Sequence, residues 1–341
     1  MRATQSDSLL HRNETAGERV ASGVYRIRTL IANLFIVETD EPGGWVLVDA
    51  GVAGFAKRIR RWARRTVGDR PPSAIVLTHG HFDHRGSLNE LLRSWDVPVY
   101  AHPLEFPYLT GRRAYPPPDP SVGGGMMARL SFLYPRRPIE VGPRLLALPS
   151  DGRIRELAGW RWCHTPGHTP GHVALFRDDD RVLLAGDAVT TTRQESAAAV
   201  VMERPELRPP PAYFTIDWPT AEASVRSLAA LEPNVLATGH GRVMRGESMR
   251  EALHDLARQF RSTMPRAGWY VSHPVHHEDR FDDRTVAPEL AQQNRRRTAT
   301  LAVAGAAFAA AALAILGRRR TRPSYARPAR RWRPPTAGLQ M

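Results

Sequence analysis

Short apolar runs and amphipathic segments alternate along the first third of the chain. Residues 24–28 and 34–37 are rich in β-branched and aromatic side chains and predict two strands, and a third strand ends at Asp49. Residues 53–66 have helical spacing, with apolar side chains recurring among arginines. The apolar stretch "SAIVLT" then predicts a buried strand that ends at Thr78. This order of strands and helices is typical of an α/β fold.

The rest of the chain predicts a second series of strands after an irregular insertion. Residues 87–95 predict a helix and the stretch "VPVYAH" a strand, but residues 103–143 contain "YPPPDP" and "GGG" and lack periodicity. We predict a long insertion there, with a short helix around 126–133. Further strands are expected at 145–148, 154–157, 160–163, 173–176, 182–185 and 234–239, and helices at 218–231 and 247–260.

Composition and charge narrow the class of protein. Cys163 is the only cysteine, which excludes an internal disulfide framework and fits a reducing compartment. The net charge is +14, but eleven arginines and no acidic residue lie from Arg295 onward, so the preceding part is close to neutral. Nucleic-acid binding by that part is therefore not expected. The polar N-terminus has no apolar signal segment, and we expect a cytoplasmic catalytic domain.

The composition predicts five segments along the chain. They are a disordered N-terminus (1–19), a hydrolase-type domain (20–265), a polar linker (266–297), a hydrophobic helix (298–317) and a basic disordered tail (318–341).

The hydrophobic helix is a candidate transmembrane segment, because residues 299–317 match the length of a membrane span and arginine triplets flank them. The alternative is a helix packed on protein or on the membrane surface. A single span would place the basic tail and the catalytic domain on opposite sides of the membrane, whereas both are expected on the cytoplasmic side. We expect association with the inner membrane through 298–317 and the tail, which can contact anionic lipid.

The sequence "THGHFDH" carries the strongest chemical signal. It follows a predicted buried strand, so its side chains lie in a loop at the carboxyl end of that strand. His79 and His81 can converge on one metal ion because alternate residues of an extended segment point the same way. Asp83 and His84 then face a second metal position. Nitrogen and oxygen donors of this kind suit zinc, and iron or manganese would also fit.

Further donors occur downstream, each just past an apolar strand. The stretch "HTPGHTPGH" contains three histidines, "LLAGDA" contains Asp187, and "LATGHG" contains His240. Loops that follow strands are where a rigid sheet positions a functional site.

These motifs, in this order, resemble the metallo-β-lactamase superfamily and, within it, the glyoxalase II-like hydrolases. The resemblance covers about residues 20–260 and implies a four-layer αββα sandwich. It assigns His79, His81 and His168 to a first metal, Asp83, His84 and His240 to a second, and Asp187 to a bridge between them. It also implies that Asp49 supports the ligand loop from behind, next to Thr78.

The resemblance implies a dinuclear hydrolase, and we expect an ester, thioester or lactone as the small-molecule substrate. Two zinc ions would lower the pKa of a bridging water, with Asp83 as the catalytic group that accepts its proton. Two alternatives stay open: an iron-dependent persulfide dioxygenase on the same fold, against which the complete second ligand set argues, and a non-catalytic membrane-associated metal-binding protein.

Several residues near the motifs have less specific readings. His164 and His172 flank the expected ligand and are interpreted as residues that pack the loop or support the ligands from behind. Aromatic and methionine side chains in or beside the irregular segments either line an apolar pocket or fasten the insertion; they are Tyr108, Tyr115, Met126, Met127, Tyr213, Phe214 and Trp218. The threonine-rich "DAVTTT" has no tyrosine after Asp187, which is unlike lactonase-type members of the family.

Overall fold

The computed structural model describes residues 17–276 and 287–302, and these form two β-sheets with flanking helices. The strands are β1 (Glu18–Ala21), β2 (Val24–Thr29), β3 (Ala32–Glu38), β4 (Trp45–Val48), β5 (Ala74–Val76), β6 (Val99–Ala101), β7 (Leu145–Ala147), β8 (Trp160–His164), β9 (Val173–Arg177), β10 (Val182–Leu184), β11 (Val235–Ala237) and β12 (Met244–Arg245). The labelled α-helices are α2 (Ala56–Val67), α3 (Phe82–Arg85), α4 (Leu88–Leu92), α5 (Phe106–Leu109), α6 (Met126–Arg129), α7 (Ala197–Met202), α8 (Trp218–Ala230), α9 (Glu247–Arg258), α10 (Phe260–Thr263) and α11 (Trp269–Ser272), and residues 288–302 are helical as well. The 3-10 helices are η1 (Pro103–Glu105), η2 (Pro120–Val122), η3 (Ser131–Leu133) and η4 (Gly142–Arg144).

The first sheet contains seven strands in sequence order, β1 to β7. Strands β1 to β4 pair antiparallel, and β4 to β7 pair parallel. Parallel neighbours point their carboxyl ends to the same edge of the sheet. The loops after β4, β5 and β6 therefore leave from one edge, and these loops contain Asp49, the histidine-rich motif and η1.

The second sheet contains five strands in the order β12-β11-β10-β9-β8. The pair β10 and β11 is parallel, with Val182 opposite Val235, and the other pairs are antiparallel. The carboxyl ends of β10 and β11 lead to Asp187 and His240. The second sheet therefore delivers its polar residues in the same way as the first.

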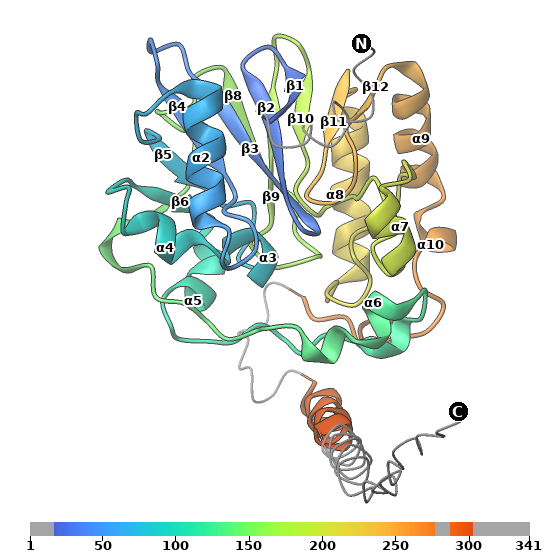
Figure 1. Cartoon of the computed structure of the whole chain (residues 1–341). Helices are drawn as coiled ribbons and strands as arrows, with labels where there is room; N and C mark the ends of the chain where they lie inside the picture. The colour runs from blue at the N-terminus through green and yellow to red at the C-terminus, as the bar shows by residue number, and fades with distance from the viewer. Residues whose placement is uncertain (1–16, 277–286, 303–341) are drawn as a thin grey trace, which may run out of the picture. The chain divides into compact units, whose positions relative to one another are not determined.

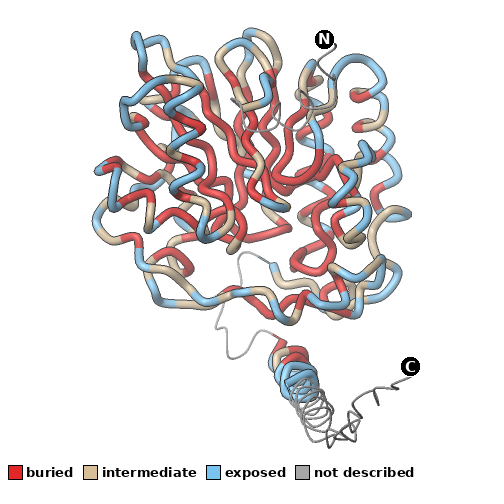
Figure 2. The backbone as a smooth tube through the Cα atoms, in the orientation of Figure 1, coloured by how far each residue is buried: buried red, intermediate tan, exposed pale blue. Residues whose placement is uncertain are grey.

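The two sheets face each other and helices cover their outer faces (Figure 1). Valines and leucines of both sheets pack together between them, while α2 and α4 cover the first sheet and α8 and α9 cover the second. Buried residues concentrate on the central strands and on the inner sides of these helices (Figure 2). The predicted α/β fold with two sheets and helices is confirmed.

The helix α2 illustrates how the local pattern selects the buried face. Ile59, Trp62 and Ala63 recur at helical spacing and pack on the first sheet, whereas lysine and arginine side chains occupy the outer face. Helix α8 begins at Trp218. The preceding residue, Asp217, is its N-cap, and its side chain accepts a hydrogen bond from the Thr220 amide at 3.1 Å.

Two local predictions are wrong. Residues 154–157, predicted as a strand, form no strand, although Ile154 and Leu157 are buried in the core between the sheets. Their apolar pattern reports burial, which an irregular segment satisfies equally well. The helix predicted for 247–260 ends at Arg258, and α10 follows as a separate short helix.

Two described parts of the predicted linker 266–297, residues 269–272 and 290–294, contain side chains that pack on the domain. Helix α11 buries Tyr270, whose hydroxyl donates to the Pro117 carbonyl at 2.7 Å. Leu290 lies in the core, and the Asn294 amide donates to the Pro118 carbonyl at 2.7 Å. These segments therefore differ from a solvated linker, because a few apolar and amide side chains anchor an otherwise polar stretch.

The remaining predictions about the termini lie mainly outside the described residues. These are the disordered segment 1–19 up to residue 16, the hydrophobic helix 298–317 beyond residue 302, and the basic tail 318–341. Within the part of the chain that the structure describes, no helix has both the length and the apolar character that a membrane span requires.

Candidate metal centre

The seven predicted ligands come together where loops from the two sheets meet. His79 and His81 follow β5, and Asp83 and His84 lie on the short helix α3. The others are His168, which lies between β8 and β9, Asp187, which follows β10, and His240, which follows β11.

Their donor atoms form three overlapping groups. Within each group, the donor atoms all lie within 4.8 Å of one another. The groups are His79, His81 and His168; His79, His84 and Asp187; and Asp83, His84 and His240. The first and third match the two ligand sets expected from the sequence, and the second shows that Asp187 lies next to both.

Asp187 occupies the centre of the cluster. Its Oδ2 atom lies 3.0 Å from Nε2 of His240 and 3.5 Å from Nε2 of His168. Its Oδ1 atom lies 3.5 Å from Nε2 of His84. One carboxylate thus reaches histidines of both predicted ligand sets, as a bridging ligand must.

Outer hydrogen bonds fix the orientation of four histidine rings. Nδ1 of His84 lies 2.8 Å from the Asp49 carboxylate, and Nδ1 of His240 lies 2.7 Å from the Ile31 carbonyl. Because carboxylate and carbonyl oxygens only accept, both Nδ1 atoms carry the proton. Each Nε2 atom then presents a lone pair to the cluster.

Threonine hydroxyls orient two further rings by the same logic. The Thr215 hydroxyl donates to the Pro211 carbonyl at 2.9 Å and accepts from Nδ1 of His168 at 3.2 Å. The Thr78 hydroxyl donates to Asp49 at 2.8 Å and lies 3.1 Å from Nδ1 of His79. Asp49 and Thr78 therefore lie behind the ligand loop, in contact with His84 and His79.

The donor set fits metal ions. Nε2 of His79, Nε2 of His84 and Oδ1 of Asp187 are buried and have no hydrogen-bond partner among the described residues. Nδ1 of His81 lies 3.0 Å from Nε2 of His168, so one ring nitrogen of each side chain points into the cluster. Buried acceptors without donors are costly unless a cation satisfies them. His and Asp donors in this arrangement suit divalent metals.

The pKa values of the cluster reflect burial and mutual charge. Burial lowers the pKa of His79 and His81 well below the usual value, and lowers that of His168 to about 3. Burial opposes charge on His84, but the Asp187, Asp49 and Asp83 carboxylates raise its pKa well above the usual value. The first histidine set is therefore neutral near pH 7, which is the state that binds metal.

The least buried edge of the cluster lies at His81 and Asp83. These two residues retain 5% and 6% exposure, more than the other five. The Phe214 ring stacks on His81 at 4.4 Å, and Tyr134 and Tyr213 pack around Phe214. An aromatic wall from the insertion and the loop before α8 therefore borders the side from which a ligand can approach.

Two other predicted lining residues lie further back. Tyr108 is buried and stacks on Tyr115 at 3.8 Å, while the Tyr115 ring in turn contacts His81 at 4.5 Å. Trp218, the first residue of α8, is buried in the core, and its ring centroid lies 6.0 Å from that of Phe260. It borders a separate hollow of about 360 Å³, whose lining contains none of the seven cluster residues.

Sequence reasoning missed several residues that hold the cluster. The Asn33 amide of β3 donates to the Thr238 and Gly241 carbonyls, both at 2.8 Å, and so fixes the loop that contains His240. Glu105 is fully buried and binds two of the ligand loops. An acidic residue inside the apolar stretch "PLEFPYL" was the available signal.

The flanking histidines, His164 and His172, belong to none of the three donor groups. Both nitrogens of His172 are used, since Nδ1 contacts the Thr165 hydroxyl at 2.8 Å and Nε2 accepts from the Asp187 amide at 2.8 Å. His164 stacks on His102 at 4.2 Å and contacts the Pro170 carbonyl.

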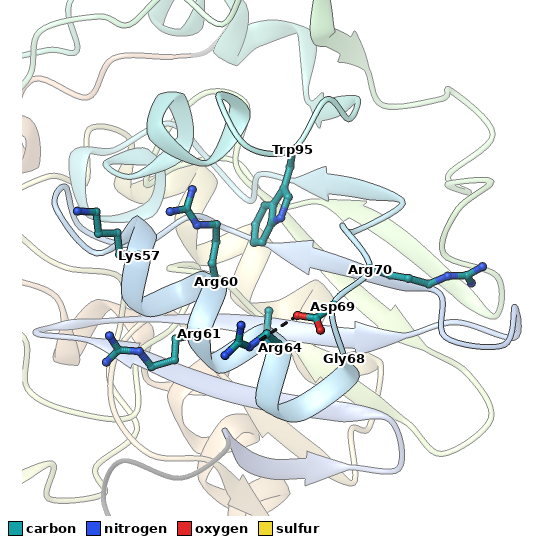
Figure 3. Close-up of a pocket in the computed structure, with 9 residues that line it drawn as sticks. Lys57, Arg60, Arg61, Arg64, Gly68, Asp69, Arg70 and Trp95 are labelled. Atoms are coloured by element: carbon teal, nitrogen blue, oxygen red, sulfur yellow. Dashed lines mark ion pairs between the residues drawn. The ribbon is translucent and has the colours of Figure 1, made fainter.

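A second hollow of about 320 Å³ lies on the outer face of α2 (Figure 3). Basic side chains surround it, among them Lys57, Arg60, Arg61 and Arg70, and Arg64 pairs with Asp69 at 3.6 Å. None of the cluster residues lines it, so it is not the metal centre.

Comparison with known proteins gives a consistent picture. Residues 27–240 match the model of the metallo-beta-lactamase superfamily. The chain is 48% identical to the probable metallo-hydrolase YflN of Bacillus subtilis over 249 residues, 72% of this chain and 94% of the relative. It is 29% identical to the probable metallo-hydrolase YybB of the same organism, over 63% of this chain and 82% of the relative.

Solved structures support the fold. A metallo-beta-lactamase family protein from Thermus thermophilus has a TM-score of 0.51 at 22% identity and covers 72% of this chain and 81% of its own. A beta-lactamase domain protein from Burkholderia ambifaria has a TM-score of 0.51 at 23% identity and covers 72% of this chain and 76% of its own.

Proposed function

The chain belongs to the metallo-beta-lactamase superfamily and is a metallo-hydrolase, and we propose that it holds two zinc ions and cleaves an ester, thioester or lactone. The position of Asp187 carries the proposal: its two carboxylate oxygens lie within 3.5 Å of histidines from both ligand sets. A single metal would need only one set. The order of motifs, which resembles glyoxalase II-like hydrolases, supports the substrate class.

We propose ligand roles for the residues in the two sets. His79, His81 and His168 would hold one ion, Asp83, His84 and His240 the other, and Asp187 would bind both. Bound divalent cations supply a water of lowered pKa and polarise the carbonyl oxygen that is attacked.

The chain's own residues contribute orientation and proton transfer. Asp49, Thr78, Thr215 and the Ile31 carbonyl hold the histidine rings with their Nε2 lone pairs directed inward. Asp83 lies at the least buried edge of the cluster, and burial raises the pKa of its carboxyl. A carboxylate with a raised pKa at this edge is suited to accept the proton of the attacking water.

The aromatic wall supports a small substrate with an apolar acyl part. Three aromatic rings lie beside the least buried edge of the cluster. They belong to Phe214, Tyr134 and Phe82, and their centroids are 5.5 to 6.3 Å apart. Such rings exclude water and contact an apolar group.

The test is metal analysis by mass spectrometry of the purified full-length chain, beside turnover of a panel of small esters, thioesters and lactones. We expect about two zinc ions per chain, with turnover that a chelator abolishes and added zinc restores. His240→Ala should lose both metal and turnover, whereas His273→Ala, outside the cluster, should keep them. About one iron per chain with oxygen consumption on a persulfide would instead assign the dioxygenase, and two zinc ions without turnover would contradict the substrate class.

A further inference from the structure

Glu105 is a buried acidic residue that is not among the proposed metal ligands. It ends the 3-10 helix η1 at the start of the insertion and has 0% exposure. A buried carboxylate is costly unless donors surround it, so its partners indicate what it does.

Four donors converge on the Glu105 carboxylate. Oε2 accepts from the Gly80 amide at 3.0 Å and from the Tyr115 hydroxyl. Oε1 accepts from the Thr169 hydroxyl at 2.7 Å and from the Gly171 amide at 2.8 Å. Because all four partners donate, the group is suited to be an ionised carboxylate, which only accepts.

The two oxygens bind different ligand loops. Gly80 lies between His79 and His81, and Thr169 follows His168 directly. One carboxylate therefore joins the two loops that supply the first ligand set, although the loops are far apart in the sequence.

Close packing at both ends supports this connection. A Cβ atom on Gly80 would lie 2.5 Å from the Tyr115 hydroxyl, and a Cβ atom on Gly171 would lie 2.7 Å from Cγ of Glu105. A side chain at Gly171 would displace the carboxylate, and one at Gly80 would displace the Tyr115 hydroxyl that donates to it, so both loops pack closely around Glu105 and its hydrogen-bond partner.

The second ligand set is held by different partners. His84 is oriented by Asp49, and His240 by the Ile31 carbonyl. The four hydrogen bonds of Glu105 reach neither of these residues. Loss of the carboxylate should therefore affect the two metal positions unequally.

We propose that Glu105 is a positioning residue that holds the loops of Gly80 and Thr169 together and thereby sets the metal affinity of the position formed by His79, His81 and His168. This inference rests on the proposed dinuclear function. It concerns the relative affinity of the two positions, which metal titration measures without any substrate.

The experiment compares the wild type with Glu105→Gln, in the full-length chain, by titrating the metal-free protein with Co²⁺ and following its visible absorption. The glutamine side chain keeps the shape of glutamate, but its NH2 group replaces one of the two oxygens. That NH2 group donates, so it cannot accept the two hydrogen bonds that the replaced oxygen accepts. We expect one equivalent of Co²⁺ to bind about 10-fold more weakly or worse, and the other with unchanged affinity.

A matched control is Glu156→Gln. Glu156 also accepts from a tyrosine hydroxyl, that of Tyr100 at 3.2 Å, but the structure gives it no hydrogen bond to a ligand loop. Its two affinities should equal those of the wild type.

Two single-donor variants keep the proposal testable if Glu105→Gln does not fold. Thr169→Val removes a donor to Oε1, and Tyr115→Phe removes a donor to Oε2 together with the hydroxyl that accepts from the Gly80 amide at 2.8 Å; both variants leave the carboxylate in place. We expect the same selective loss, of about threefold or more.

Equal weakening at both positions, or none at either, in folded variants would overturn the proposal. A wild type that binds fewer than two Co²⁺ ions would instead contradict the proposed dinuclear function, so the two failures are distinguishable.

Discussion

Nδ1 of His84 lies 2.8 Å from the Asp49 carboxylate, and both side chains are buried. The Asp49 carboxylate also accepts hydrogen bonds from the Thr78 amide, at 2.8 Å, and from the Thr78 hydroxyl. One acidic residue at the end of β4 thus fixes a ring on α3 and the start of the loop after β5. This contact directs Nε2 of His84 into the cluster.

Asp49→Asn should weaken metal binding by about 10- to 100-fold. The amide can donate to Nδ1 of His84, which favours the tautomer with the proton on Nε2, where the metal would bind. Competition with a zinc chelator measures the affinity. Asp96→Asn is the control, since Asp96 is exposed and pairs with Arg144 at 2.8 Å; equal losses in both variants would contradict the role of Asp49.

Asp187→Ala should reduce the metal content from about two ions per chain to one or none, and reduce turnover by about a thousandfold or more. The reason is that its carboxylate reaches both ligand sets. Metal analysis and initial rates measure the two effects. Asp178→Ala, at an exposed pair with Arg161, should change neither; a variant at Asp187 that keeps two ions and full turnover would refute the bridging assignment.

Trp218→Ala should destabilise the domain by about 3–5 kcal/mol, because it empties a core position beneath α8. Trp218→Phe should lose less and keep kcat/KM close to the wild-type value. Denaturant unfolding and initial rates on the same preparations separate the two effects. A large fall in kcat/KM for Trp218→Phe at unchanged stability would instead return Trp218 to the substrate site.

His172 should make the metal-free protein less stable as the pH falls. Burial, and next the charge of His168, lower the pKa of His172 to about 3. Between the unfolded value of about 6.5 and about 3, the unfolded state binds a proton that the folded state does not, so stability falls as the pH falls through this window. The glutamine of the His172→Gln variant does not titrate, so position 172 takes up no proton when that variant unfolds.

The stability difference between wild type and His172→Gln should therefore shrink by about 2 kcal/mol from about pH 7.5 to about pH 5. Denaturant unfolding of both chains, treated with a chelator, measures it. A difference that stays constant over this range would show that His172 binds a proton equally in both states.

Much of the fold was predictable because its signals are local. The spacing of Ile59, Trp62 and Ala63 identified the buried face of α2, and apolar runs identified β5, β10 and β11. Residues 154–157 were mistaken for a strand because burial in a strand and in an irregular segment selects the same side chains.

The ligand candidates were predictable for a related reason. His79 and Asp187 follow apolar strands directly, so their place at the edge of a sheet is a property of a few neighbouring residues. The sequence alone also contains the order of the motifs, which carried the resemblance to the superfamily.

The contacts that hold the site together depended on the tertiary structure. Glu105 binds Gly80, Thr169 and Gly171, the last two more than sixty residues away, and nothing in its local sequence names them. Likewise, Tyr270 anchors a stretch whose polar composition predicted a linker. Strand and helix patterns arise from interactions between near neighbours along the chain, whereas these partners meet only when the two sheets pack and bring distant loops to one edge.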